Sequence, residues 1–279
     1  MELLLLSVFC SVSVGILFKI SKLHSVELIS TLFIGYITSL ILGSVLLDVS
    51  FSYANLDLYS IIIIVILSFL MPSLFVALRK SILINGIAKT DLVQRMSLIV
   101  PVFASFVFFN ESLSFIKIAA LLLGMFSVYL IMHRNEKNIH KKNSSYLLFI
   151  FIGYGIVDIL FKLMSSIPFK NTLLLVFVGC IITTLFYIIF TKSKFSAKSL
   201  LIGILLGTLN FFNIYSYLQA HTKLSDTPTI VFTCMNLGVI GLGLIVGATI
   251  FKEKISKWNI VGLICAIFAI LLLSYKMLL

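Results

Sequence analysis

Long apolar runs, separated by short polar segments, follow one another along the whole chain. A helix that spans a membrane needs about 20 predominantly apolar residues, and ten runs meet that requirement. The pattern predicts transmembrane helices at residues 3–20, 27–47, 58–82, 88–109, 113–132, 145–165, 171–191, 199–220, 228–250 and 257–277. We therefore expect an all-α integral membrane protein with ten transmembrane helices.

The longest polar segment, HRNEKNIHKKN at 133–143, lies at the middle of the chain. It is rich in bases and separates five predicted helices from the next five. A basic linker is therefore predicted at 133–144, between a first five-helix unit at 1–132 and a second at 145–279.

The two predicted units carry the same short patterns. A shift of 142 residues aligns FFNESLSFIKIAALLLGMF with IFKEKISKWNIVGLICAIF, which pairs Phe109 with Phe251, Glu111 with Glu253 and Ser114 with Ser256. The tetrapeptide ILFK also occurs twice, at 16–19 and at 159–162. Because five is an odd number, the second unit must enter the membrane from the opposite side. The sequence thus predicts two inverted five-helix repeats, an architecture that recurs in secondary transporters.

The composition places the chain in lipid. Hydrophobic residues make up 61% of it and charged residues 11%, against about 45–50% and 25% in soluble domains. A net charge of +11 would indicate nucleic acid in a soluble protein. Here the bases flank apolar runs, so we expect a lipid bilayer and no nucleic-acid partner. The four cysteines lie in apolar runs without the paired spacing of a metal site or disulfide framework.

The bases are unevenly shared between the two sides of the predicted bundle. Of the 21 Lys and Arg residues, fifteen belong to the odd-numbered connections and the helix ends beside them. The even-numbered connections and the C-terminus hold five, and Arg95 lies within a span. Because cytoplasmic loops are enriched in bases, we expect cytoplasmic odd connections, both termini outside, and a bacterial inner-membrane location.

Two segments, QRMSLIVPVFASFVFFNESLS at 94–114 and TCMNLGVIGLGLIVGATIFKEKIS at 233–256, give the chain a specific resemblance. Together with the five-plus-five arrangement, they resemble the EamA-type transporters of the drug/metabolite transporter superfamily. The resemblance covers essentially the whole chain. It implies a central cavity lined by helices 1, 3, 4, 6, 8 and 9, but no particular substrate, since the family handles many kinds of metabolite and drug. It also implies cytoplasmic termini, whereas the charges of this chain predict the opposite.

Charged side chains inside spans are the first candidates for a substrate site, because they usually face a cavity or a partner. Asp158 is the acid clearly within a span, and Lys162 follows one turn later, where the two can pair. Asp158 could also bind a proton or a cationic group. Arg95, beside Gln94, lies roughly 12 Å into its helix. Its guanidinium could grip a carboxylate or phosphate, or snorkel toward the interface.

Uncharged polar residues near the middle of spans extend this set. Asn210 and Asn236 could line the cavity or join helices by hydrogen bonds. Tyr154 and Tyr215, with the neighbouring Tyr217, could add aromatic lining or pack between helices.

Other conspicuous positions are interpreted as structural. Glu111 and Glu253 stand just before predicted helices, where carboxylates favour the helix N-terminus. Pro101 and Pro72 can kink the helices that contain them. The histidines, His221 among them, lie in or beside connections, where we expect solvated side chains.

These observations predict a secondary, non-ATP transporter of a small polar or amphipathic metabolite, working by alternating access with proton coupling or exchange. The alternative is a non-transporting membrane partner that uses the same fold for assembly. No protease, hydrolase or nucleotide-binding motif appears, so neither enzyme activity nor a cofactor is expected. GILLG at 203–207 and GLIVG at 243–247 permit close helix approach within the chain, and a homodimer contact as well.

Overall fold

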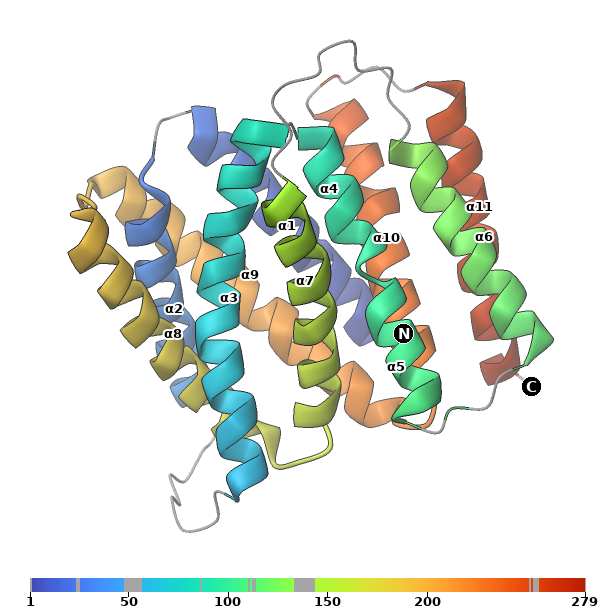
Figure 1. Cartoon of the computed structure of the whole chain (residues 1–279), viewed down its shortest axis with the longest axis horizontal. Helices are drawn as coiled ribbons and strands as arrows, with labels where there is room; N and C mark the ends of the chain where they lie inside the picture. Colours follow the sequence, from blue (N-terminus) through green and yellow to red (C-terminus); the bar gives the residue numbers. More distant parts are fainter. Residues whose placement is uncertain are drawn as a thin grey trace.

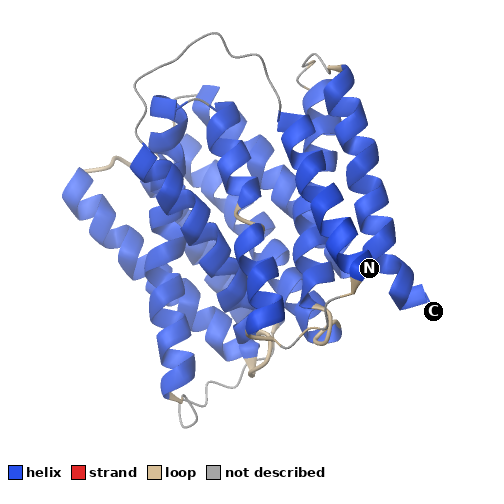
Figure 2. Ribbon diagram, turned by 45° about the vertical axis from the view of Figure 1, so that its right-hand side comes forward, coloured by secondary structure: helices blue, strands red, loops and turns tan. Residues whose placement is uncertain are grey.

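The structure, a computed structural model, describes residues 2–23, 26–47, 57–85, 87–109, 111, 114–132, 144–250, 252 and 256–278. Helices occupy most of these residues, and no strand occurs among them (Figure 2). The helices are α1 (Glu2–Leu23), α2 (Leu28–Leu46), α3 (Leu58–Asn85), α4 (Ile87–Met96), α5 (Ile99–Val107), α6 (Phe115–Met132), α7 (Ser144–Met164), α8 (Phe169–Thr191), α9 (Ala197–Lys223), α10 (Pro228–Thr249) and α11 (Lys257–Leu278). The all-α class is confirmed.

Six of these helices are long and apolar enough to cross a membrane by length and composition: α2, α3, α7, α8, α9 and α10. Shorter apolar stretches lie in α1, α4 with α5, α6 and α11, at 2–17, 93–107, 115–130 and 257–273. The chain is thus a multi-pass α-helical membrane protein. Residues 133–143 of the predicted linker, and Glu253, lie outside the described residues.

The predicted helix at 88–109 is interrupted. Its two parts, α4 and α5, are separated by a turn at Ser97 and Leu98. Pro101 explains the break, because proline lacks an amide hydrogen and its ring clashes with the carbonyl four residues earlier, here that of Ser97. That carbonyl accepts a hydrogen bond of 3.0 Å from the Val100 amide instead. Pro72, in contrast, lies within a continuous α3.

Helices from the two ends of the sequence pack against each other (Figure 1). Helix α2 lies along α9, and α3 lies along α8; α1 contacts α9 and α10, whereas α7 contacts α3, α4 and α5. Helices α6 and α11 pair at the right of Figure 1. The largest apolar core joins α2, α3, α7, α8 and α9 around fully buried residues such as Leu67, Leu173 and Phe177.

The bundle has two ends, which Figure 1 shows at its lower and upper edges. At the lower face, α7 and α9 end and α10 begins. At the upper face, α7 and α9 begin and α10 ends. The helix ends at the lower face are those that the even-numbered connections of the sequence analysis join.

The predicted close approach at GILLG occurs within the chain. A Cβ atom on Gly207 would lie 2.2 Å from the backbone oxygen of Gly35, so α2 and α9 touch through their backbones. The Ser39 hydroxyl donates a hydrogen bond of 2.8 Å to the Gly207 carbonyl across the same crossing. By contrast, a Cβ atom on Gly243 of GLIVG would meet nothing within 4 Å.

Candidate functional site

Asp158 lies in the C-terminal third of α7, where its side chain is partly buried. The phenol of Tyr217, from α9, donates a hydrogen bond of 3.1 Å to its carboxylate. The Arg95 guanidinium and the Asn236 amide both lie within interaction range of the same carboxylate. Four elements, α4, α7, α9 and α10, therefore bring an acid, a base, an amide and a phenol together; we call these four residues the central cluster.

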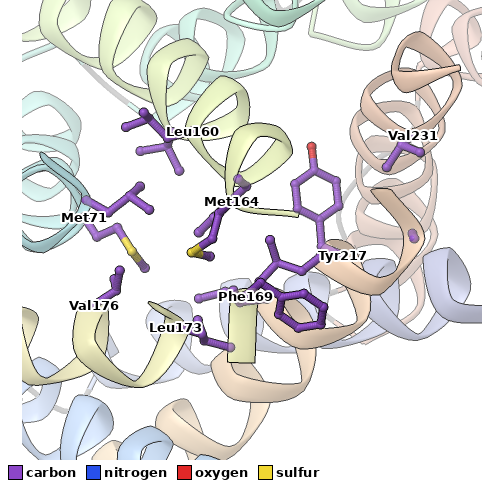
Figure 3. Close-up of a cluster of buried hydrophobic side chains, with 14 of the residues drawn as sticks. Met71, Leu160, Met164, Phe169, Leu173, Val176, Tyr217 and Val231 are labelled. Atoms are coloured by element: carbon purple, nitrogen blue, oxygen red, sulfur yellow. The ribbon is translucent and has the colours of Figure 1, made fainter. Parts of the chain in front are cut away.

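Each member of the central cluster is held by its own helix. The break at 97–98 places Arg95 in the last turn of α4, so its long side chain projects from a helix end. Asn236 donates from Nδ2 to the Phe232 carbonyl at 3.0 Å. The Tyr217 ring packs edge-on to Phe161, with centroids 6.2 Å apart. Figure 3 shows Tyr217 beside the apolar core, with its hydroxyl pointing away from Phe169.

The central cluster brings an acidic and a basic side chain to one place inside the bundle. Arginine binds carboxylates and phosphates through paired N–H groups, and a carboxylate accepts from an ammonium group or binds a proton. In an apolar bundle, such groups are retained where they pair with each other or with a ligand.

Other predicted site residues lie elsewhere. Asn210 lines a narrow cleft between α2, α3 and α9, with Tyr36 and Phe75. Tyr154 packs, partly buried, against the largest core. Tyr215 stacks on Phe211 at 5.9 Å and packs in the same core.

Gln94 and Lys162 are also placed by local contacts. The Gln94 carbonyl accepts a bond of 2.6 Å from the Ser97 hydroxyl at the α4–α5 turn. Lys162 is buried, and its ammonium donates to the Ser225 carbonyl at 3.0 Å. It does not form the ion pair with Asp158 that their spacing allowed, because the two side chains have different partners. Of the alternatives that the sequence left open for this pair, the structure does not show the ion pair.

The prediction for His221 was wrong. Helix α9 continues beyond the predicted end at residue 220, which places His221 inside it. The imidazole is fully buried, against the rings of Tyr217 and Phe232 with both centroids 4.7 Å away. Neither ring nitrogen has a hydrogen-bond partner among the described residues.

Glu111 has a more specific role than the sequence indicated. Its carboxylate accepts from the backbone amide of Thr229 at 3.0 Å and from the Thr229 hydroxyl at 2.6 Å. The same carboxylate pairs with the Lys117 ammonium at 2.8 Å. Glu111 thus caps α10, not the helix that follows it in sequence.

Sequence reasoning missed a further polar contact between α1 and α9. Ser7 is fully buried, and its hydroxyl lies 2.7 Å from the Asn213 side-chain oxygen. Neither residue belongs to a motif, and a serine in an apolar run gives no local signal of a partner 206 residues away.

The sequence has a relative of nearly the same length. An uncharacterized protein of Haemophilus influenzae is 34% identical over 285 residues, which cover 99% of this chain and 98% of that protein. The chain belongs to the same family as this protein. No family model matches the chain.

The fold of this family member is shared with a solved crystal structure. The two superpose with a TM-score of 0.72 over 99% of each chain, at 9% sequence identity. At that identity the similarity establishes a common fold and nothing about substrate.

Proposed function

We propose that this chain is a secondary transporter of the EamA type, which moves a small polar or amphipathic metabolite by alternating access. One observation carries the proposal: inside an apolar bundle, Tyr217 donates a hydrogen bond of 3.1 Å to the Asp158 carboxylate, and the charge of Arg95 acts on the same carboxylate. Ionisable residues at such positions mark substrate and ion pathways in membrane proteins. Arg95 comes from the first half of the chain and Asp158 from the second, so the central cluster lies where the halves meet.

The helix contacts support ten crossings arranged as two inverted repeats. If α1, α2, α3, α4 with α5, and α6 correspond to α7, α8, α9, α10 and α11, the contacts fall into matched pairs. Thus α2 with α9 corresponds to α8 with α3, and α1 with α9 corresponds to α7 with α3. Likewise, α1 with α10 corresponds to α7 with α4 and α5. Two equivalent halves of opposite orientation can exchange conformations around a site between them.

The charges favour a cytoplasmic upper face in a bacterial inner membrane. The lower face already has fewer bases, and two of them are engaged inside the protein. Lys117 pairs with Glu111, and Lys162 binds the Ser225 carbonyl. Neither is therefore free to meet lipid headgroups. The excess of free bases at the upper face over the lower face is larger than the residue count alone indicates, and this excess favours a cytoplasmic upper face.

The central cluster favours a zwitterionic metabolite. Its carboxylate or phosphate would bind Arg95, while an ammonium group would lie against Asp158. Asp158 could instead exchange a proton with the solute, and this would couple transport to the proton gradient.

A screen of metabolites by thermal unfolding of the purified protein tests the proposal, because a solute that binds the folded state raises its stability. A stabilising solute should then cross proteoliposome membranes that contain the protein. Arg95→Gln and Asp158→Asn should abolish both effects, whereas Glu27→Gln, which removes an exposed charge near α2, should leave them intact. Binding without flux would point to a non-transporting membrane partner, and binding unchanged in both site variants would exclude the central cluster.

A further inference from the structure

At the lower face, a buried polar contact joins the two halves of the chain. Glu111 belongs to the first half, and its carboxylate holds the first turn of α10 through the amide and hydroxyl of Thr229. Both Glu111 and Thr229 are buried, at 6% and 0% exposure. Lys117, also from the first half, pairs with the second carboxylate oxygen at 2.8 Å.

A second contact joins the halves at the same end. The Lys162 ammonium donates to the Ser225 carbonyl, just before α10, and lies 5.8 Å from the centroid of the Phe109 ring. Phe109 follows α5 in the first half, so Lys162 connects α7, the α9–α10 turn and the end of α5. The charges of Asp226 and Glu111 act on the same ammonium.

Glu111 is not needed to cap α6, the helix that follows it in sequence. The Ser114 hydroxyl already accepts a hydrogen bond of 3.3 Å from the Lys117 amide in the first turn of α6. Glu111 instead caps a helix 118 residues further along the chain. Its carboxylate is therefore placed to hold one half against the other.

These contacts lie between the central cluster and the lower face. Thr229, Thr233 and Asn236 recur at the spacing of one face of α10, so Thr229 stands seven residues, about 10 Å, nearer the lower face than Asn236. Thr233, between them, is fully buried. The buried Thr229 and Thr233 therefore lie between Asn236 and the lower face, next to the Glu111 contact.

We propose that Glu111, bound to Thr229 and Lys117, is a latch that closes the lower face and opens during the transport cycle. A buried ion pair adds little stability compared with apolar packing of the same volume, so stability alone does not explain it. In an open state water would solvate both charges, and the closed and open states can then lie close in free energy. An apolar contact at this position would expose its buried surface to water on opening. It would therefore favour the closed state much more strongly.

The latch rests on the proposed alternating access but can be tested without a solute. The reporter is Thr233→Cys in a chain whose four native cysteines are replaced by serine. A membrane-impermeant maleimide is applied to spheroplasts and to inside-out vesicles. Asp226→Cys, exposed beside α10, shows in a parallel sample which preparation presents the lower face.

Opening the latch should make the reporter reactive from the lower face alone. Glu111→Gln should raise the labelling rate of Thr233→Cys roughly fivefold or more, and Thr229→Val, a milder change, should raise it less. Glu27→Gln, the matched charge removal, should leave it unchanged. If Glu111→Gln fails to fold, as judged by gel filtration, the labelling rate in Thr229→Val tests the latch instead.

Two results would overturn the latch. One is unchanged labelling in every folded latch variant; the other is increased labelling from both faces, which indicates a loosened fold. Neither result bears on solute binding, so the transporter proposal is tested separately by the thermal-unfolding screen and proteoliposome flux. Conversely, one-sided opening would support the latch even if the solute screen finds no ligand.

Discussion

The phenol of Tyr217 donates a 3.1 Å hydrogen bond to the Asp158 carboxylate, linking α9 to α7 inside the bundle. Tyr217 is buried and Asp158 partly buried, so the bond is largely shielded from competing water. It fixes the direction in which the carboxylate faces Arg95 and Asn236. The geometry of the central cluster therefore depends on a residue that bears no charge.

Tyr217→Phe should lower the free energy of unfolding by about 1–2 kcal/mol, because a buried acceptor loses its donor. Denaturant unfolding in detergent measures the change. Tyr59→Phe, at a residue 42% exposed, should have almost no effect. In an Asp158→Asn background the loss should shrink, since coupled residues are not additive; an equal loss in both backgrounds would show that the bond contributes nothing.

Lys117→Met should destabilise the protein by about 3–5 kcal/mol, because removing one partner of a buried pair leaves the other charge uncompensated. The side chains of Lys117 and Glu111 are 10% and 1% exposed. Lys198→Met, at an exposed lysine of α9, serves as the control and should change stability by less than about 0.5 kcal/mol. Adding Glu111→Gln to Lys117→Met should recover part of the loss, and a further loss would mean that the pair is not the cause.

Run length and proline chemistry were sufficient to predict much of the fold. Helices occupy all ten predicted segments because each apolar run must satisfy its backbone groups internally in lipid. A kink was predicted at both Pro101 and Pro72; the helix is broken just before Pro101, whereas α3 runs on through Pro72. For the site, Arg95, Asp158 and Asn236 could be selected because polar groups inside spans are rare, although their proximity depends on the tertiary fold.

Glu111 and His221 show where local patterns are insufficient. The segment FFNES places Glu111 near a helix start, but the helix that it caps lies 118 residues away in sequence. For His221, the predicted helix ended at residue 220, whereas α9 extends to Lys223. A difference of three residues in the position of a helix end is thus the reason that His221 was predicted to be solvated, whereas it is fully buried.

His221→Phe should raise the stability of the protein by about 1 kcal/mol or more. Both imidazole nitrogens are buried without a hydrogen-bond partner among the described residues, and a buried unsatisfied polar group costs about 1–3 kcal/mol. Phenylalanine fills a similar volume between the rings of Tyr217 and Phe232. Thermal unfolding measures the gain, and His221→Ala, which leaves a cavity, should lower stability instead. A loss in His221→Phe would show that the imidazole has a polar role.

Gly207→Ala should destabilise the protein by about 1–3 kcal/mol, the range for overpacking. The added methyl would lie 2.2 Å from the Gly35 oxygen, and this backbone atom cannot move aside without separating α2 from α9. Gly243→Ala is the matched control, because its Cβ position is open and alanine favours a helix over glycine by about 0.5–1 kcal/mol. Unfolding of both variants in one detergent compares them directly. A similar effect at the two positions would mean that both glycines act through helix propensity, whereas opposite signs would tie GILLG to the α2–α9 crossing on which the bundle is built.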